Sequence, residues 1–133
     1  MGLDMYAYRV KRGMVTEQVD FEVPENADDQ SELHYWRKHP NLHGWMERLY
    51  YDKGGKEDVF NCVNVQLTED DLDRLEKSVI NEHLPHTEGF FFGESQPDDR
   101  VDDLEFIKKA RKAIFEGDDV YYTSCWTYLE SFF

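Results

Sequence analysis

The beginning and the end of the chain both consist of alternating apolar and polar residues, and this pattern most constrains the fold. Residues 3–10 and 120–126 alternate in this way, which is typical of β-strands. Two segments between them, 69–84 and 96–117, instead repeat apolar residues at helical spacing. Strands and helices do not alternate regularly enough for a doubly wound fold. We therefore predict an α+β fold with a mainly antiparallel sheet and about three to four helices.

Further elements are predicted between these segments. Residues 16–23 and 59–67 alternate like two more strands. A helix is predicted over residues 31–39, where Pro40 interrupts it. Asn41 is expected to cap a second helix, which ends at the sequence KGGK.

The two long helical patterns carry their own boundary signals. Thr68 and Asp71 approximate a capping box, and Pro85 is expected to end the helix that they begin. Gly117 is predicted to stop the later helix in a left-handed conformation. The run GFFFG at 89–93 lacks the glycine spacing of a phosphate-binding loop and is expected to be a core strand. Alternatively, its glycines would let the backbone approach a bound ring closely.

Length and charge narrow the class of protein. The chain of 133 residues fits a single domain, 1–133. Its net charge of -14 repels phosphate backbones, so direct nucleic-acid binding is not expected. No secretory segment or membrane-spanning apolar run is apparent, so we expect a cytoplasmic protein. Cys62 and Cys125 are then expected to be free, buried thiols, with a single disulfide as the alternative.

One stretch, ELHYWRKHPNLHGWMERLYY at 32–51, concentrates aromatic, histidine and basic side chains. Residues 34–58 hold five Lys or Arg against four acids, whereas residues 17–32 hold seven acids and no base. In so acidic a chain, an anion is expected to bind at the segment in which basic residues outnumber acidic ones. Trp36 would offer a stacking face, and the guanidinium of Arg37 suits phosphate or carboxylate. The predicted ligand-binding residues are Asp4, Tyr6, Trp36, Arg37, Lys38, His39, His43 and Asn61.

The same stretch also has a purely structural interpretation. Tyr35 and Trp36 would then pack as the buried face of a helix, and Arg37 and Lys38 would be solvated or paired with acids. The sequence alone leaves both interpretations open.

Metal binding and catalysis find less support. Pro40 separates His39 from His43, so these histidines do not form a regular helical pair, and no zinc motif is present. We expect no metal and no cofactor. Ser124 lacks the setting of a nucleophile elbow, and no set of nucleophile, base and orienting residue can be placed. Binding is therefore expected rather than catalysis.

The blocks MGLDMYAY, ELHYWRKHPNLHGWM, FNC, LPHTEGFFFG and YYTSCW, in this order, resemble a family of small proteins encoded by bacteriophages and prophages. The blocks extend over nearly the whole chain. The resemblance implies an accessory phage protein that is made in the bacterial cytoplasm. Some members of the family are labelled as a sugar-phosphate kinase, but this chain is too short for that two-domain enzyme and has no nucleotide loop.

These observations lead to a first functional hypothesis and to alternatives. In the first hypothesis, the protein is an anti-defence protein that sequesters a small anionic or nucleotide-like host signal in an aromatic-lined pocket. Alternatively, the acidic surface would imitate the charge of DNA and bind a basic host protein. A small hydrolase or nucleotide-modifying enzyme is the third interpretation. The aromatic content is also compatible with a homodimer, because apolar composition does not distinguish a core from an interface.

Overall fold

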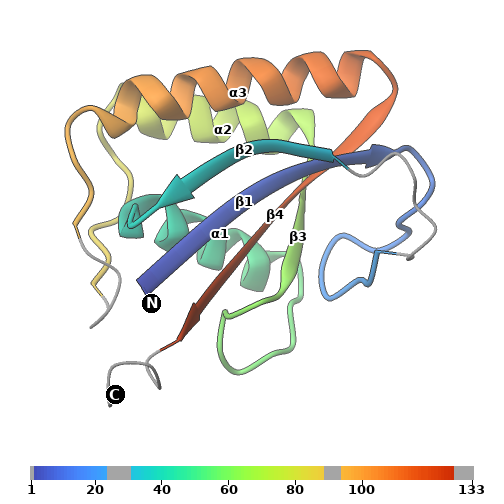
Figure 1. The fold of residues 1–133 in the computed structure, drawn as a ribbon, viewed down its shortest axis with the longest axis horizontal. Coiled ribbons are helices and arrows are strands. Elements are labelled where there is room, and N and C mark those ends of the chain that lie inside the picture. The colour runs from blue at the N-terminus through green and yellow to red at the C-terminus, as the bar shows by residue number, and fades with distance from the viewer. Residues whose placement is uncertain (1, 24–30, 89–93, 128–133) are drawn as a thin grey trace.

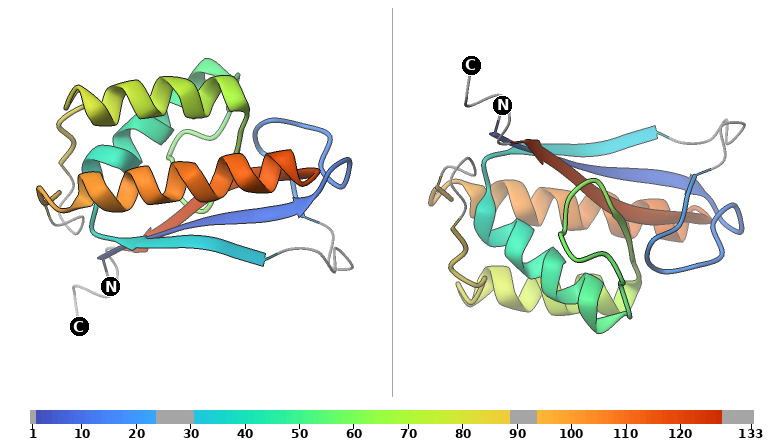
Figure 2. Two further views of the ribbon diagram at one scale, coloured as in Figure 1. Left: turned by 90° about the horizontal axis from the view of Figure 1, so that it is seen from above. Right: turned by 90° about the horizontal axis from the view of Figure 1, so that it is seen from below.

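The structure, a computed structural model, describes residues 2–23, 31–88 and 94–127. Its strands form one antiparallel sheet in the order β2-β1-β4-β3. Figures 1 and 2 show the three helices on the same side of this sheet, so the predicted α+β fold is confirmed. The elements are β1 (Gly2–Lys11), β2 (Ser31–Arg37), α1 (Pro40–Asp52), β3 (Asn64–Leu67), α2 (Glu69–Ile80), α3 (Asp99–Phe115) and β4 (Asp118–Thr127).

The alternating segments at the two ends of the chain become the central strands. β1 pairs with β4 along its whole length and with β2 on its other side. Leu3, Met5 and Ala7 point toward the helices and are fully buried, while Asp4 and Tyr6 between them point to the uncovered face. The strand predicted from the alternation of residues 3–10 is therefore confirmed.

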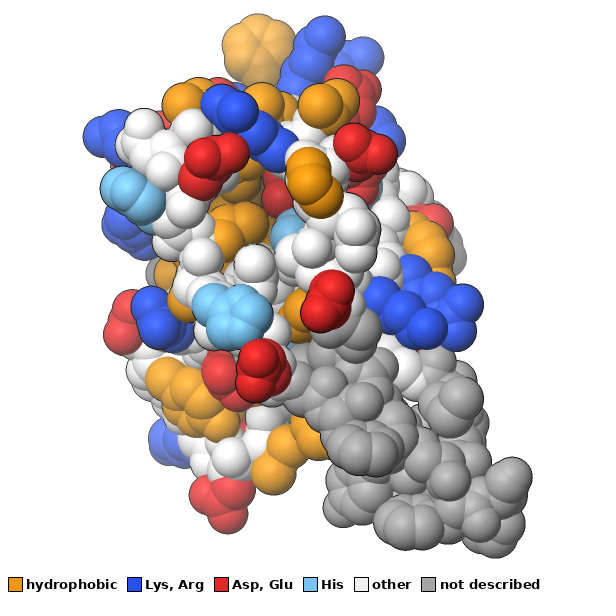
Figure 3. Space-filling view, turned by 90° about the vertical axis from the view of Figure 1, so that its left-hand side faces the viewer, with side chains coloured by type: hydrophobic (Ala, Val, Ile, Leu, Met, Phe, Trp, Pro, Cys, Tyr) orange, Lys and Arg blue, Asp and Glu red, His pale blue; other side chains and the backbone are white. Residues whose placement is uncertain are grey.

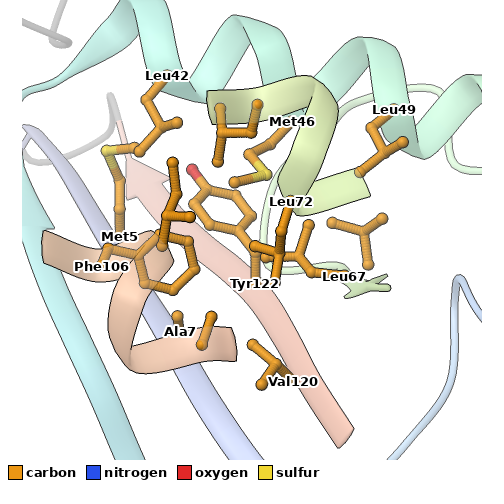
Figure 4. Close-up of a cluster of buried hydrophobic side chains, with 14 of the residues drawn as sticks. Met5, Ala7, Leu42, Met46, Leu49, Leu67, Leu72, Phe106, Val120 and Tyr122 are labelled. Carbon is orange, nitrogen blue, oxygen red and sulfur yellow. The ribbon is translucent and has the colours of Figure 1, made fainter. Parts of the chain in front are cut away.

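Tyr122 of β4 lies at the centre of the core between the sheet and the helices (Figure 4). Its side chain is fully buried, and this burial raises the pKa of the phenol. Every element supplies neighbours to this region, which include Met5, Trp36, Leu42, Met46, Leu67, Leu72 and Phe106. The tight packing of so many elements around one ring fixes the positions of the side chains next to it.

The predicted helix over residues 31–39 is wrong, because residues Ser31–Arg37 form the edge strand β2. Pairing with β1 places Trp36 opposite Met5 and Arg37 opposite Asp4. This pairing satisfies backbone groups that β1 would otherwise leave unpaired. The side chains consequently alternate between the two faces of the sheet and do not share one helical face.

The next helix, α1, begins two residues earlier than predicted. Lys38 turns the chain with a left-handed φ of 56°, and Pro40 occupies the first turn of the helix, where proline needs no backbone hydrogen bond. His39 is the N-cap residue instead of Asn41. Pro40 therefore initiates a helix here and does not interrupt one.

The two shorter strand predictions are only partly right. Residues 59–67 contribute the short strand β3 (Asn64–Leu67), because Cys62 has a left-handed φ of 57° that a strand does not allow. In residues 16–23 the described pairing is one isolated bridge between Val19 and Val65. This segment instead folds over one end of the uncovered sheet face, where Phe21 packs against Tyr121.

The boundary signals of the two long helices are mostly confirmed. Thr68 and Asp71 form the predicted capping box of α2, and Gly117 after α3 has a φ of 100°. α2 ends at Ile80, earlier than predicted, because Glu82 adopts a left-handed φ of 57°. Among the described residues, no helix combines the length and the apolar character needed to cross a membrane. The predicted strand at 89–93 lies outside the described residues.

The expectation of two free, buried thiols is wrong. Cys62 and Cys125 are exposed and joined by a disulfide bond, with their Cα atoms 4.6 Å apart. The left-handed turn at Cys62 carries this residue out of the sheet and over the uncovered face, next to β4. The bond ties the segment before β3 to the central strand β4.

Candidate functional site

Three of the predicted ligand-binding residues, Asp4, Tyr6 and Arg37, lie on the uncovered face of the sheet. Tyr35 donates a hydrogen bond from its hydroxyl to Asp4 Oδ1 (2.7 Å), and this bond raises the pKa of Tyr35 to about 12. Arg37 Nε lies 3.7 Å from the same carboxylate oxygen. The guanidinium of Arg37 thus faces an acid of the protein itself, on an open surface.

Trp36 and His43 lie in the core, so the prediction that Trp36 offers a stacking face to a ligand is wrong. Strand alternation turns the indole inward, where it is 3 % exposed and packs against Phe106 at 4.7 Å between ring centroids. His43 Nδ1 lies 3.1 Å from Ser124 Oγ and 3.2 Å from the Tyr122 hydroxyl. Burial lowers the pKa of His43 to about 4, which keeps this imidazole neutral at pH 7.

Lys38 and Asn61 line neither of the two clefts described below. Lys38 is exposed in the left-handed turn between β2 and α1. The side chain of Asn61 donates to the carbonyl of Trp126 (2.9 Å) and accepts from its backbone N–H (2.8 Å). Asn61 is therefore a structural residue that holds its segment against β4.

The remaining predicted residue, His39, belongs to a chain of polar contacts that the sequence did not reveal. Its Nε2 lies 2.8 Å from Asp103 Oδ2, and its Nδ1 lies 2.6 Å from Ser95 Oγ. Trp36 donates from Nε1 to the other oxygen of Asp103 (3.1 Å). Burial raises the pKa of Asp103, and the hydrogen bonds from His39 and Trp36 act in the opposite direction.

These polar residues line a cleft of about 280 Å³ at the end of the molecule where α1 and α3 begin and α2 ends. Its walls combine His39, Ser95 and Asp103 with apolar side chains such as Val79 and Leu84. Figure 3 faces this end and shows hydrophobic side chains and a histidine recessed between charged side chains. We call this site the polar cleft.

A second cleft, of about 470 Å³, lies between α1 and α2. Trp45, Arg48 and Asp52 reach it from one face of α1, because residues three and four positions apart share a helical face. The indole of Trp45 is half-buried and donates from Nε1 to Ser78 Oγ (3.3 Å). Its lining includes Trp45, Arg48, Lys53, Arg74, Ser78 and His83. We call this site the cationic cleft.

The charge of the cationic cleft differs from that of the chain. Among its described lining residues, Arg48, Lys53 and Arg74 stand against one carboxylate, that of Asp52. Behind them the buried carboxylate of Asp71 contacts both Lys53 Nζ and Arg74 Nη2. Three basic against two acidic groups leave one positive charge in excess, in a chain whose net charge is -14.

Arg48 differs from the other two basic residues of the cationic cleft. It is exposed, and its side chain has no hydrogen bond or ion pair with any described residue. Lys53, by contrast, is held by Asp71 and by the carbonyl of Gln66 (2.7 Å). The guanidinium of Arg48 is therefore the group in this cleft that is least committed to a contact within the protein.

The cationic cleft includes residues of the basic segment that the sequence singled out, but none of the eight predicted ligand-binding residues lines it. Arg48 and Lys53 are two of the five basic residues in the segment 34–58, and both line the cationic cleft. The spacing of Trp45, Arg48 and Asp52 on one helical face was the signal available for this site. Ser95 and Asp103 had no such signal, because they meet His39 only through the tertiary fold.

The described residues contain no group of three or more His, Cys, Asp or Glu side chains arranged to hold a metal ion.

No protein-family model, curated protein or solved structure matches the chain.

Proposed function

We propose that the protein binds a small anionic ligand with a planar ring, such as a mononucleotide, in the cationic cleft. The observation that carries this proposal is the grouping of three basic side chains beside an exposed part of an indole in a strongly acidic chain. A positive site within a negative surface concentrates an anion and rejects the extended phosphate backbone of a nucleic acid.

The side chains of the cleft suit the two parts of such a ligand. Arg48 and Arg74 are planar donors that match phosphate or carboxylate oxygens, and the side chain of Arg74 is 60% exposed. Trp45 presents its ring as an apolar wall for a base or another planar group. The volume of about 470 Å³ lies within the range of sites that hold small molecules.

The biological role that fits this binding is sequestration. A phage protein that holds a nucleotide-like signal would lower the free concentration of that signal in the host cell and so act against host defence. Such a role needs a binding site and high affinity, and it does not need turnover.

Arg48→Ala is the most informative substitution for this proposal. Binding of adenosine 5′-monophosphate, cyclic mononucleotides and inorganic phosphate would be measured by calorimetry and by thermal shift. We expect Arg48→Ala to weaken binding of the preferred ligand about tenfold or more, which corresponds to about 1.4 kcal/mol. The melting temperature without ligand should hardly change, because the exposed side chain of Arg48 makes no hydrogen bond or ion pair with a described residue.

Arg12→Ala is the matched control, because Arg12 is an exposed arginine outside the cleft. Equal loss of binding in both variants would reduce the effect to overall charge and contradict a specific site. Absence of any thermal shift with all these ligands would also contradict the proposal, since a ligand at 100 times its Kd should stabilise the fold by about 2.7 kcal/mol.

A further inference from the structure

The polar cleft holds a serine, a histidine and an aspartate in a continuous chain of hydrogen bonds. Ser95 Oγ lies 2.6 Å from His39 Nδ1, and His39 Nε2 lies 2.8 Å from Asp103 Oδ2. The three residues come from the segment before α3, the N-cap of α1 and α3 itself. Their contact distances are those expected of a nucleophile, its base and a residue that orients the base.

The surrounding groups determine the direction of these hydrogen bonds. The backbone N–H of Asn41 donates to Ser95 Oγ (3.1 Å), and Trp36 Nε1–H donates to Asp103 Oδ1 (3.1 Å). With Asp103 ionised, its second oxygen accepts the Nε2–H of His39, so His39 Nδ1 carries the lone pair. Asp99 Oδ2 also faces this nitrogen, at 3.5 Å, but Ser95 Oγ at 2.6 Å is its nearer neighbour. The hydroxyl proton of Ser95 then points at that lone pair, which is the arrangement a general base requires.

The three hydrogen-bonded residues differ in their exposure to solvent in the way that catalysis requires. His39 is 2 % and Asp103 is 1 % exposed, so their geometry is held by packing. Ser95 is only half-buried and lies on the wall of the polar cleft. Val79 and Leu84 provide an apolar surface beside it. Arg100 brings a positive charge to the same cleft, whose lining also holds the carboxylates of Glu82 and Asp99.

We propose that Ser95 is a nucleophile for acyl transfer from small carboxylic esters, with His39 as its general base and Asp103 as a positioning residue. In the first step Ser95 Oγ bonds to the ester carbonyl carbon while its proton moves to His39 Nδ1. The C–O bond to the leaving alcohol then breaks, and His39 returns the proton to that alcohol. Water next attacks the acyl carbon and gives a proton to His39. The bond between that carbon and Ser95 Oγ then breaks, His39 returns the proton to Ser95 Oγ, and the carboxylic acid leaves.

Three further residues of the cleft would take part in this reaction. Arg100 would stabilise the negative charge that develops on the carbonyl oxygen, and Val79 with Leu84 would contact the acyl chain. The activity is separate from ligand binding in the cationic cleft, since none of the residues that carry it lines that cleft.

The first test is covalent trapping. The intact protein would be treated with an alkyl fluorophosphonate and mapped by mass spectrometry, and its turnover of 4-nitrophenyl acetate would be measured. We expect a single adduct on Ser95, and a fall of at least 100-fold in the labelling rate in His39→Gln. Labelling of folded protein at other residues only, or labelling of Ser95 that does not depend on His39, would overturn the proposal.

Ser124→Ala is the matched control, because Ser124 Oγ also lies within hydrogen-bond distance of a histidine, at 3.1 Å from His43 Nδ1, but outside the cleft. Its labelling and turnover should equal those of the wild type. Arg48→Ala should also label normally, so failure of the ligand-binding proposal and failure of this one are distinguishable.

The positioning role of Asp103 is tested by Asp103→Asn, which keeps an acceptor for Trp36 Nε1. The amide nitrogen of Asn would donate to His39 Nε2 and so force the proton onto Nδ1, which removes the base. We expect the labelling rate to fall at least 100-fold while circular dichroism stays native, and the pH profile of acylation should change with it. A native fold with an unchanged rate and pH profile would overturn this role.

Discussion

Two histidines one turn apart at the start of α1 have similar burial but different surroundings. His39 and His43 are each 2 % exposed, and each places Nδ1 near a serine hydroxyl, at 2.6 Å for Ser95 and 3.1 Å for Ser124. His39 also holds the carboxylate of Asp103 on its second nitrogen. The described hydrogen-bond partners of His43 are hydroxyl groups, and burial lowers its pKa to about 4.

Burial alone makes a histidine a neutral core residue, whereas a hydrogen bond to a buried carboxylate polarises the ring. The ring of His43 packs against Phe60 at 4.9 Å between centroids and contributes mainly volume to the core. His39 instead has one nitrogen oriented by Asp103 and the other directed at the half-buried Ser95. Three experiments test this comparison directly.

Removing the carboxylate should have the largest effect on stability. Asp103→Ala leaves the buried N–H groups of Trp36 and His39 without an acceptor, and each such group costs roughly 1–3 kcal/mol. We expect the free energy of unfolding to fall by about 4 kcal/mol, as measured by urea titration with tryptophan fluorescence.

The control for this substitution is Glu105→Ala, an exposed position on the same helix, where a change within about 0.5 kcal/mol is expected. Equal stability of Asp103→Ala and Glu105→Ala would show that the carboxylate does not anchor His39, and the contrast with His43 would then disappear.

The second largest effect is expected from acid, which should lower the free energy of unfolding through protonation of His43 in the unfolded chain. Its pKa is about 4 in the folded protein against 6.5 in the unfolded chain, so the unfolded chain binds more protons between these values. The stability that depends on neutral His43 is complete above pH 6.5 and is lost as the pH falls to 4. This loss amounts to about 3 kcal/mol.

His43→Gln removes the titrating group, so the difference in unfolding free energy between wild type and variant should shrink by that amount from pH 7 to pH 4. His86→Gln is the control, because the side chain of His86 is 80% exposed. A constant difference between wild type and His43→Gln across this pH range would show that desolvation does not govern His43.

Much of this fold was predictable from local patterns. The alternation of residues 3–10 and 120–126 predicted the central strands, and the capping box at Thr68 and Asp71 predicted the start of α2. Ser31–Arg37 was not predictable as a strand, because its assignment depends on pairing with β1, and β1 is distant in sequence. Tertiary pairing here outweighed a local pattern compatible with a helix.

The candidate sites were less predictable than the fold, for the same physical reason. His39 was chosen from its basic neighbourhood, but Ser95 and Asp103 lie 56 and 64 residues away in sequence. Arg37 was expected in a pocket, and the strand geometry instead places it beside Asp4. Side chains on one helical face can be predicted from spacing, whereas residues that meet through the sheet and the helix layer cannot.

The smallest expected effects come from the two serines. Ser124 is 1 % exposed, so Ser124→Ala leaves the neighbouring imidazole of His43 with one hydroxyl fewer in a site closed to water. That loss should lower the free energy of unfolding by about 1–2 kcal/mol.

Ser95 borders the polar cleft, where water can replace its hydroxyl, so Ser95→Ala should lower the free energy of unfolding by only about 0.5 kcal/mol. Urea titrations of both variants measure this order. A larger loss for Ser95→Ala would identify Ser95 as a structural cap of α1, because its Oγ also accepts from the backbone of Asn41, and the two serine–histidine pairs would then differ less than their burial indicates.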